Sequence, residues 1–231
     1  MACQQESPLV RERSPAALLS AAVLGFVIGS FSAADVAARL ARGNGTDLRR
    51  EGSGNPGAMN AGSVLGRRWG YLVLVADVLK GVLASVIGRS VAGDDGAYVA
   101  GAAAVAGHAY PPLKGFQGGK GVATSLGTAA VCMPAYAPLD VVVAAVSYRV
   151  ASKGSKGSDE HVDTWAPAWA GTFAASSTFV LAALATWRLG RNALWGPKPS
   201  VLLPVYAVVV SGTIFVRFVT GRQVAKEVER D

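Results

Sequence analysis

The stretch MPAYAP at residues 133–138 lies in the middle of an apolar run, Val122–Tyr148, and decides how the chain is expected to fold. Its two prolines, Pro134 and Pro138, break the interior of a helix. One continuous helix would place the two ends of the run on opposite sides of a membrane, whereas a hairpin returns both ends to the same side. We therefore predict a hairpin of two short helices, tilted or re-entrant.

The composition places this hairpin in a membrane protein. Of the 231 residues, 51% are hydrophobic and only 16% are charged, and the mean hydropathy is +0.35. About 20 apolar residues suffice for a helix to cross a bilayer. The sequence predicts an all-α, polytopic protein of about seven transmembrane helices, with one membrane domain at 16–220 between polar tails at 1–15 and 221–231. The near-uncharged runs are Ala16–Leu40, Trp69–Gly88, Ala97–Leu113, Val122–Tyr148, Trp165–Trp187 and Ser200–Thr220.

The net charge of +7 is distributed as expected for a membrane protein rather than for a nucleic-acid binder. The basic residues lie in loops between the apolar runs, not on one face with aromatic side chains for base stacking. With the hairpin, most loop Lys and Arg residues fall on one side, which the positive-inside rule assigns to the cytoplasm. We expect a multi-pass protein of the cell membrane with its N-terminus outside. Cys3 and Cys132 indicate neither a disulfide framework nor a metal site.

Two glycine-rich loops carry the chemistry on the expected cytoplasmic side: GSGNPGAMN at 52–60 and GFQGGKGVAT at 115–124. Glycine lets backbone N–H groups converge on an anion, and Arg49, Arg50 and Lys120 add positive charge. The second loop also opens a helix whose N-terminus attracts anions. These features indicate a phosphate site at a bilayer surface. The alternative is that the glycines serve only tight turns and close helix packing.

Several ionisable residues lie within the apolar runs. Asp77 and Lys80, at i and i+3, share one helix face, and they form either a structural ion pair or part of a polar pocket; Asp35 has the same two readings. His108 is either hydrogen-bonded structure or a substrate ligand. Arg149, Ser152 and Ser155, at a spacing of three, suit phosphate oxygens.

These residues resemble the bacterial integral-membrane glycerol-3-phosphate acyltransferases that use acyl-phosphate as donor. The likeness follows the family's order through GSF at 29–31, DLRREGSGNPGAMN at 47–60, DVLKG at 77–81, GHAYP at 107–111 and GGKGVAT at 118–124. It implies seven helices and acyl transfer from acyl-phosphate to sn-glycerol 3-phosphate, giving lysophosphatidic acid and phosphate in phospholipid biosynthesis. Membrane lipid is the other implied partner; no acyl-CoA, metal or cofactor is implied, and the oligomeric state stays open.

The resemblance also implies residue roles. Arg49 and Lys120 would bind substrate phosphate, Ser53, Gly54 and Asn55 would shape the acceptor pocket, and Arg149 with Ser152 would match an Arg/Ser segment of the family. The catalytic candidates are Ser53, Asn55, Lys120, Arg149 and Ser152. The substrate-binding candidates are Arg49, Gly54, Asn60, His108, Gly118, Gly119, Gly121 and Thr124.

The chain departs from the family pattern at three places. Ala33 and Met59 stand where a serine and a threonine are expected, and residues 215–223 contain no counterpart of a C-terminal His and Asn. One alternative is therefore a catalytically impaired homologue, unless Arg217 or Arg222 takes the place of that motif. The other is a transporter or binding protein for a phosphorylated or anionic solute, with Asp35, Asp77 and Lys80 along its pathway.

Overall fold

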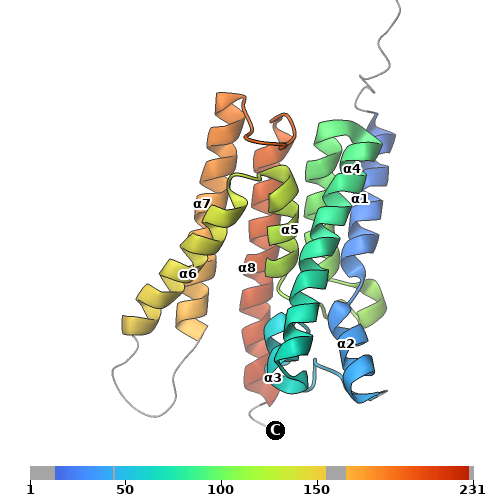
Figure 1. The fold of residues 1–231 in the computed structure, drawn as a ribbon, viewed down its shortest axis with the longest axis vertical. Helices are drawn as coiled ribbons and strands as arrows, with labels where there is room; N and C mark the ends of the chain where they lie inside the picture. Colours follow the sequence, from blue (N-terminus) through green and yellow to red (C-terminus); the bar gives the residue numbers. More distant parts are fainter. Residues whose placement is uncertain (1–13, 44, 155–164, 229–231) are drawn as a thin grey trace, which may run out of the picture.

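The described residues of the computed structural model, 14–43, 45–154 and 165–228, form an all-α bundle, as the sequence predicts (Figure 1). Several helix ends coincide with a residue that disfavours continuation or caps the next helix; for example, the Ser32 hydroxyl accepts a hydrogen bond from the Asp35 N–H at 3.3 Å. This cap divides the first apolar run into two helices. The helices are α1 Pro15–Ser30, α2 Ala33–Arg42, α3 Ala58–Leu65, α4 Arg67–Ala109, α5 Val122–Cys132, α6 Ala137–Gly154, α7 Trp165–Leu189 and α8 Leu202–Val228, with a 3-10 turn, η1, at Pro112–Lys114.

Helix α4 contains two of the predicted apolar runs, because the chain bends sharply inside it. Ala92 and Gly93 leave helical geometry, and Gly93 takes a φ of 67° that favours glycine. The two halves lie side by side in Figure 1, and a Cβ at Gly88 would overlap the Gly96 carbonyl. The helix therefore doubles back on itself.

The predicted hairpin is confirmed: α5 ends at Cys132, α6 begins at Ala137, and the intervening residues form a turn. Four of the described helical segments are long and apolar enough to cross a membrane, namely Pro15–Arg42, Arg67–Lys114, Ala170–Leu189 and Leu202–Thr220. The segments Val122–Cys132 and Ala137–Ser147 are apolar but shorter. The figure of seven crossings stays a prediction, since it requires both halves of α4 and both short helices to cross.

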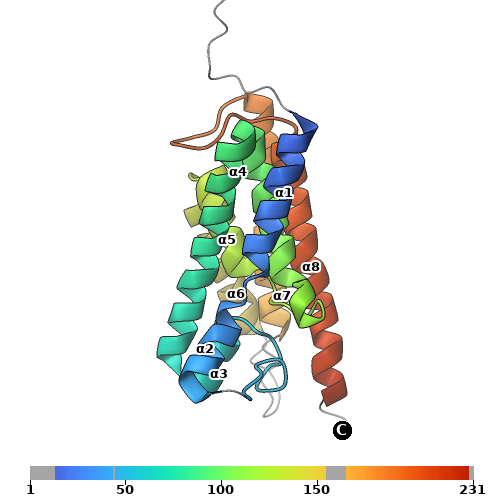
Figure 2. The same cartoon turned by 90° about the vertical axis from the view of Figure 1, so that its right-hand side faces the viewer.

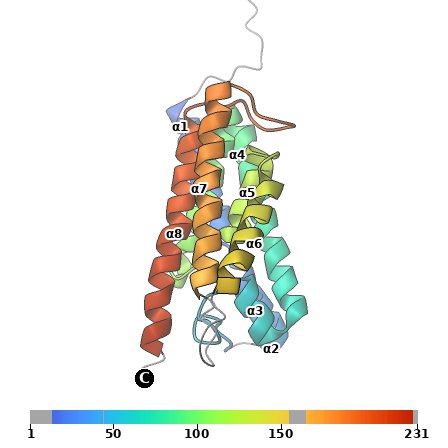
Figure 3. The same cartoon turned by 90° about the vertical axis from the view of Figure 1, so that its left-hand side faces the viewer.

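Small residues let the helices approach closely, as is common in membranes. Gly25 and Gly29 of α1 pack on the backbone of Ala100 and Ala104 of α4, and Gly81 packs on the backbone of Thr124 of α5. A second contact region is aromatic, where the Phe179 and Tyr206 rings of α7 and α8 meet edge to face at 5.6 Å. The two helices lie side by side in Figure 3. These contacts hold α1 and α5 against α4 and α7 against α8, while the two glycine-rich loops connect α2 to α3 and α4 to α5.

Candidate phosphate-binding site

The first glycine-rich loop is folded around the side chain of Asn60. This residue is 2% exposed; its Nδ2 donates to the Leu48 and Glu51 carbonyls at 2.9 Å each, and its Oδ1 accepts from the Ser53 N–H at 2.8 Å. Gly52, with a φ of 59°, has no room for a Cβ beside Asn60 Oδ1. The Asn60 amide thus shapes the loop, and a direct contact between Asn60 and substrate stays a prediction.

Arg49 joins the two loops. Its Nε donates to the Gln117 carbonyl of the second loop at 2.7 Å, and its Nη1 contacts Asp35 Oδ1 at 2.7 Å and Asp47 Oδ1 at 3.2 Å. Burial lowers the pKa of the Arg49 guanidinium, but the hydrogen bonds and charges of Asp35 and Asp47 outweigh burial and raise this pKa overall. Arg49 is therefore a fixed, permanently charged bridge between segments far apart in the sequence.

A polar cavity of about 470 Å³ opens beside Arg49. Lys114 Nζ lies 2.9 Å from Asp35 Oδ2 at its wall, so the single carboxylate of Asp35 pairs with two cations, Lys114 and Arg49. Three cationic and two anionic side chains line the cavity, which leaves an excess of positive charge for an anion. The lining residues are Asp35, Arg39, Gly45, Thr46, Asp47, Arg49, Lys114 and Gln117.

The second loop returns along the end of α4. The Gly118 N–H donates to the Ala109 carbonyl at 3.1 Å and the Gly119 N–H donates to the His108 carbonyl at 3.2 Å. Both glycines are buried, and a Cβ at Gly119 would overlap the His108 ring. The expectation that these two glycines leave their backbone open beside Lys120 is therefore wrong: their N–H groups are used within the protein, and the missing side chains allow close packing on His108.

Asp77, Lys80 and His108 meet beneath this loop. Asp77 Oδ1 lies 2.9 Å from Lys80 Nζ and 3.5 Å from His108 Nδ1, and Lys80 Nζ donates to the Phe31 carbonyl at 2.9 Å. All three side chains are buried. The Asp77–Lys80 pair predicted from its spacing is thus present, and it links the α1–α2 junction to His108 and the loop above.

Lys120 is held by an aromatic ring rather than by a carboxylate. Its Nζ lies 4.2 Å from the centroid of the Phe218 ring of α8, a cation–π contact. Burial lowers the pKa of Lys120 below its ordinary value of 10.5. Next to Phe218, Arg217 Nε donates to the Gly119 carbonyl at 3.4 Å, and Arg217 Nη2 donates to the Gly118 carbonyl. In Figure 2 the loop between α2 and α3, η1 and the lower part of α8 lie next to one another.

The other predicted residues are placed as follows. Ser53 is exposed at the tip of the first loop, with Gly54 and Asn55 beside it half-buried; Gly121 precedes α5 with a φ of 87°. Thr124 is fully buried, and its Oγ1 has no hydrogen-bond partner among the described residues.

Arg149 and Ser152 belong to α6, whose C-terminal part diverges from α5 and α8 in Figure 1, so their roles stay predictions. Ser155 lies outside the described residues.

Sequence reasoning missed Lys114 and Gln117 as parts of the site. Lys114, the last residue of η1, contacts Asp35, and the Gln117 carbonyl accepts from Arg49. Arg217, which the sequence offered as a substitute for the missing C-terminal motif, reaches the second loop from α8. A signal for Arg217 was present, because a charged residue inside an apolar helix needs a polar partner. The identity of that partner required the structure. Within the described residues no group of three or more His, Cys, Asp or Glu side chains is arranged to hold a metal ion.

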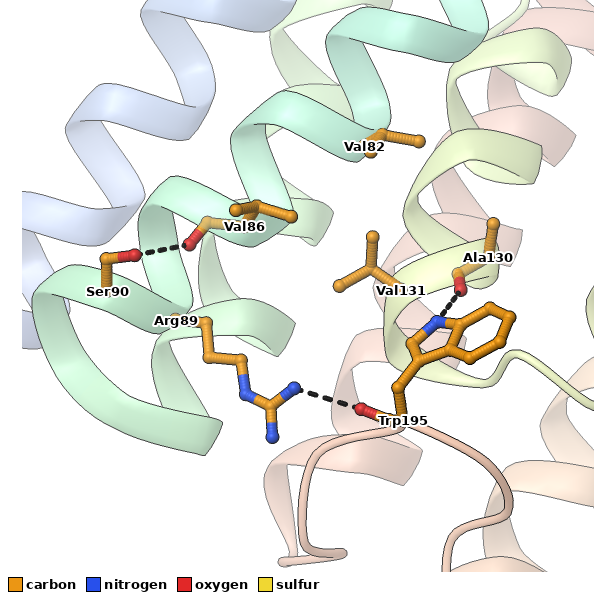
Figure 4. Close-up of a pocket in the computed structure, with 7 residues that line it drawn as sticks. All are labelled: Val82, Val86, Arg89, Ser90, Ala130, Val131 and Trp195. Carbon is orange, nitrogen blue, oxygen red and sulfur yellow. Dashed lines mark hydrogen bonds between the residues drawn. The ribbon is translucent and has the colours of Figure 1, made fainter.

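A second cavity, of about 540 Å³, has a different character (Figure 4). Its cation, Arg89, pairs with Asp94 at 2.9 Å and donates to the Trp195 carbonyl at 2.9 Å. Its walls are otherwise mostly apolar, with Val82, Val86 and Val131 among the lining residues. This cavity adjoins neither glycine-rich loop, so the phosphate-binding candidates remain those in the region of Arg49 and Lys120.

Comparison with known proteins agrees with the resemblance drawn from the motifs. The model of the family described as Glycerol-3-phosphate acyltransferase matches residues 19–219. The glycerol-3-phosphate acyltransferase of Thermoanaerobacter sp. (strain X514) is 42% identical over 113 residues, covering 49% of this chain and 56% of the relative. Glycerol-3-phosphate acyltransferase 1 of Deinococcus radiodurans is 44% identical over 117 residues, covering 50% and 58%. The chain thus spans little more than half the length of the curated relatives it matches.

The fold is similar to that of a solved membrane protein over most of the chain. The crystal structure of PlsY (YgiH), an integral membrane glycerol 3-phosphate acyltransferase, in its glycerol 3-phosphate form is 29% identical, with a TM-score of 0.66, and covers 89% of this chain and 90% of that one. Its lysophosphatidic acid form is 28% identical, with a TM-score of 0.61. At 89% of this chain, the match extends beyond the region of the identified motifs.

Proposed function

Because the chain belongs to the glycerol-3-phosphate acyltransferase family, we propose that it transfers a fatty acyl group from acyl-phosphate to the 1-hydroxyl of sn-glycerol 3-phosphate. The products are lysophosphatidic acid and inorganic phosphate, and the reaction serves phospholipid biosynthesis. The solved relative, described in a glycerol 3-phosphate form and a lysophosphatidic acid form, supports this acceptor and this product.

One observation carries the proposal: two cations at the second glycine loop have no carboxylate partner among the described residues. Lys120 contacts the Phe218 ring, and Arg217 contacts two carbonyls and lies 5.4 Å from the Tyr110 ring centroid. A partly buried cluster of like charges is costly until an anion binds, and both substrates carry phosphate.

The proposed reaction requires positioning and charge stabilisation rather than a nucleophilic side chain. The acceptor hydroxyl oxygen forms a bond to the acyl carbonyl carbon, the bond from that carbon to the phosphate oxygen breaks, and the hydroxyl proton leaves with inorganic phosphate. Phosphate is already a good leaving group. Lys120 and Arg49 hold the phosphate groups in place and stabilise charge on the reacting oxygens.

The remaining candidates surround this centre in the proposal. Ser53, Gly54 and Asn55 border the acceptor at the tip of the first loop, where they are accessible. Thr124, with its unpartnered hydroxyl, and Gly121 border it at the start of α5. Arg149 and Ser152 of α6 complete the site when substrate binds, and His108 acts from beneath the loop.

The site is proposed to face the cytoplasm at the surface of the cell membrane. Its loops adjoin apolar helices, so an acyl chain can enter sideways from the bilayer while the two phosphate groups stay at the polar surface. The exposed side chains of α1 support a lipid-facing helix: Leu19 and Val27 are 66% and 63% exposed. This arrangement explains why a site for a lipid donor and a water-soluble acceptor lies at a bilayer surface.

A transport pathway is less well supported, because its candidate charges are already paired. Asp77 contacts Lys80 and His108, and Asp35 contacts Arg49 and Lys114. Such ion pairs hold helices and loops together, so their polar groups are not available to a transported solute.

The donor is tested with the purified protein in detergent. Palmitoyl-phosphate and palmitoyl-CoA are each supplied with glycerol 3-phosphate, and lysophosphatidic acid is measured by mass spectrometry. We expect product from palmitoyl-phosphate alone. Equal or faster product formation from palmitoyl-CoA would contradict the proposed donor.

A further inference from the structure

Two consecutive residues of α8, Arg217 and Phe218, contact three consecutive residues of the second glycine loop. Arg217 donates to the Gly118 and Gly119 carbonyls, and the Phe218 ring lies against the Lys120 ammonium at 4.2 Å. One turn earlier, Ile214 faces Gly121, where a Cβ would lie 3.6 Å from Ile214 Cγ1. Residues at i, i+3 and i+4 share one helix face, so this face of α8 follows the loop from residue 118 to residue 121.

The loop is thereby held from two sides. On the α4 side its N–H groups donate to the His108 and Ala109 carbonyls, and on the α8 side its carbonyls accept from Arg217. Gly118 and Gly119 have no side chains of their own to fix the loop, and glycine has more conformational freedom to lose than any other residue. The position of the Lys120 backbone therefore depends on both helices.

Phe218 fixes the other end of Lys120. The Phe218 side chain is 6% exposed, so its ring is itself held in the core of the bundle, and it offers one face to the ammonium group. A lysine side chain otherwise samples many rotamers, and fixing them before substrate binds reduces the entropy lost on binding. The aromatic face attracts the ammonium group without neutralising it, so its charge stays available to a phosphate.

We propose that Arg217 and Phe218 are positioning residues of the phosphate site, which hold the backbone and the ammonium group of Lys120 ready for a substrate phosphate. This inference rests on the proposed function for its substrate, but it predicts phosphate binding whether or not acyl transfer occurs. Arg217 acts through the loop carbonyls and Phe218 acts through Lys120.

The test compares Phe218→Leu, which removes the ring face, with Phe218→Tyr, which keeps it. Phe215→Leu is the matched control, since this phenylalanine of the same helix is 43% exposed. Arg217→Lys retains the positive charge but loses the planar guanidinium group that donates to two carbonyls. Binding of inorganic phosphate and of glycerol 3-phosphate is measured by calorimetry in detergent, and turnover and thermal unfolding are measured on the same samples.

We expect Phe218→Leu and Arg217→Lys to weaken phosphate binding and raise KM by about threefold to thirtyfold, the range of one cation–π contact. Phe218→Tyr and Phe215→Leu should bind as the wild type does, and the unfolding temperature of Phe218→Tyr should match the wild type. A Phe218→Leu or Arg217→Lys variant that binds phosphate with wild-type affinity would overturn the proposal. So would a Phe218→Tyr variant that folds but binds as poorly as Phe218→Leu.

Acyl transfer by the wild type is judged separately from phosphate binding by the variants. If the wild type binds phosphate but does not transfer acyl groups, the assigned reaction fails, whereas the binding series still decides the roles of Arg217 and Phe218. If the folded wild type binds neither inorganic phosphate nor glycerol 3-phosphate, both proposals are overturned.

Discussion

At the scale of single residues, Lys120 illustrates how a membrane protein can keep a charge available for substrate. Asp35, Asp77 and Asp94 each pair with a cation elsewhere in the molecule, whereas Lys120 meets an aromatic ring. A carboxylate at the same place would bind the ammonium group more strongly and compete with phosphate. Under the proposed function the aromatic partner leaves the Lys120 ammonium group available to a phosphate, whereas Arg49 is proposed to bind phosphate while it remains paired with Asp35 and Asp47.

Replacement of Lys120 by alanine tests this distinction. Lys120→Ala should reduce kcat/KM by about 100-fold or more, because a charge-assisted contact to the reacting phosphate is lost. The unfolding temperature should change little, since no ion pair is broken. Lys198→Ala is the matched control, an exposed lysine in the loop before α8. Retention of most activity in Lys120→Ala would exclude the role assigned to this residue.

The pH dependence of substrate binding offers a second test of Lys120. Burial lowers the pKa of Lys120 below 10.5, so the ammonium group is lost at a lower pH than in an exposed lysine, and KM for glycerol 3-phosphate should rise there. In the pH range between the lowered pKa of folded Lys120 and its ordinary value of 10.5, this residue binds more protons in the unfolded chain than in the folded one. The free energy of unfolding contributed by this group therefore rises with pH, and a loss of activity there is not unfolding driven by Lys120.

Lys120→Arg provides the control for this profile, because arginine stays protonated at every pH used. The residual activity of Lys120→Arg should lack the alkaline rise in KM. The same rise in both proteins would show that a different group titrates.

At the scale of elements, the sequence was most informative where one residue type dictates backbone geometry. Pro134 and Pro138 predicted the α5–α6 hairpin because proline in a helix interior loses a hydrogen bond; Pro134 lies in the turn, and Pro138 lies in the first turn of α6, where proline is tolerated. The break at Ser32 was not predicted, because this single N-cap residue lies within an otherwise apolar run. The contacts of Arg49 with Gln117 and of Arg217 with Gly119 join segments 68 and 98 residues apart, and no local pattern encodes such pairings.

The second loop should tolerate no side chain at Gly119, where a Cβ would overlap the His108 ring. Gly119→Ala is expected to displace the loop and lower kcat/KM by about tenfold or more, since small misplacements of catalytic groups are costly. Gly212→Ala in α8, with nothing within 4 Å of the added Cβ, should leave turnover unchanged. Comparable turnover in both variants would argue against a tightly packed loop.

The packing of α1 on α4 gives a stability prediction. A Cβ at Gly29 would overlap the Ala104 carbonyl, so Gly29→Ala should force the helices apart and destabilise the fold by about 1–3 kcal/mol. Thermal unfolding in detergent measures this effect against Gly212→Ala, where alanine should be neutral or stabilising. An unchanged unfolding temperature for Gly29→Ala would contradict the close approach of α1 and α4.

At the scale of the whole molecule, the topology follows from charge and is open to direct test. Met59 on the glycine-loop side and Leu194 in the loop after α7 are both exposed, at 91% and 71%. In a background without Cys3 and Cys132, Met59→Cys should react with an impermeant maleimide only after the cell membrane is opened. Leu194→Cys should react in intact cells. The reverse pattern would place the site on the outer side.

The central claim is that the molecule as a whole performs acyl transfer with its unneutralised cations as the phosphate site. The most direct measurement supplies purified wild type and Lys120→Ala with palmitoyl-phosphate, with and without glycerol 3-phosphate, and follows phosphate release together with product mass. The account predicts acceptor-dependent release and lysophosphatidic acid from the wild type alone. No turnover by a folded wild type that still binds glycerol 3-phosphate would contradict it.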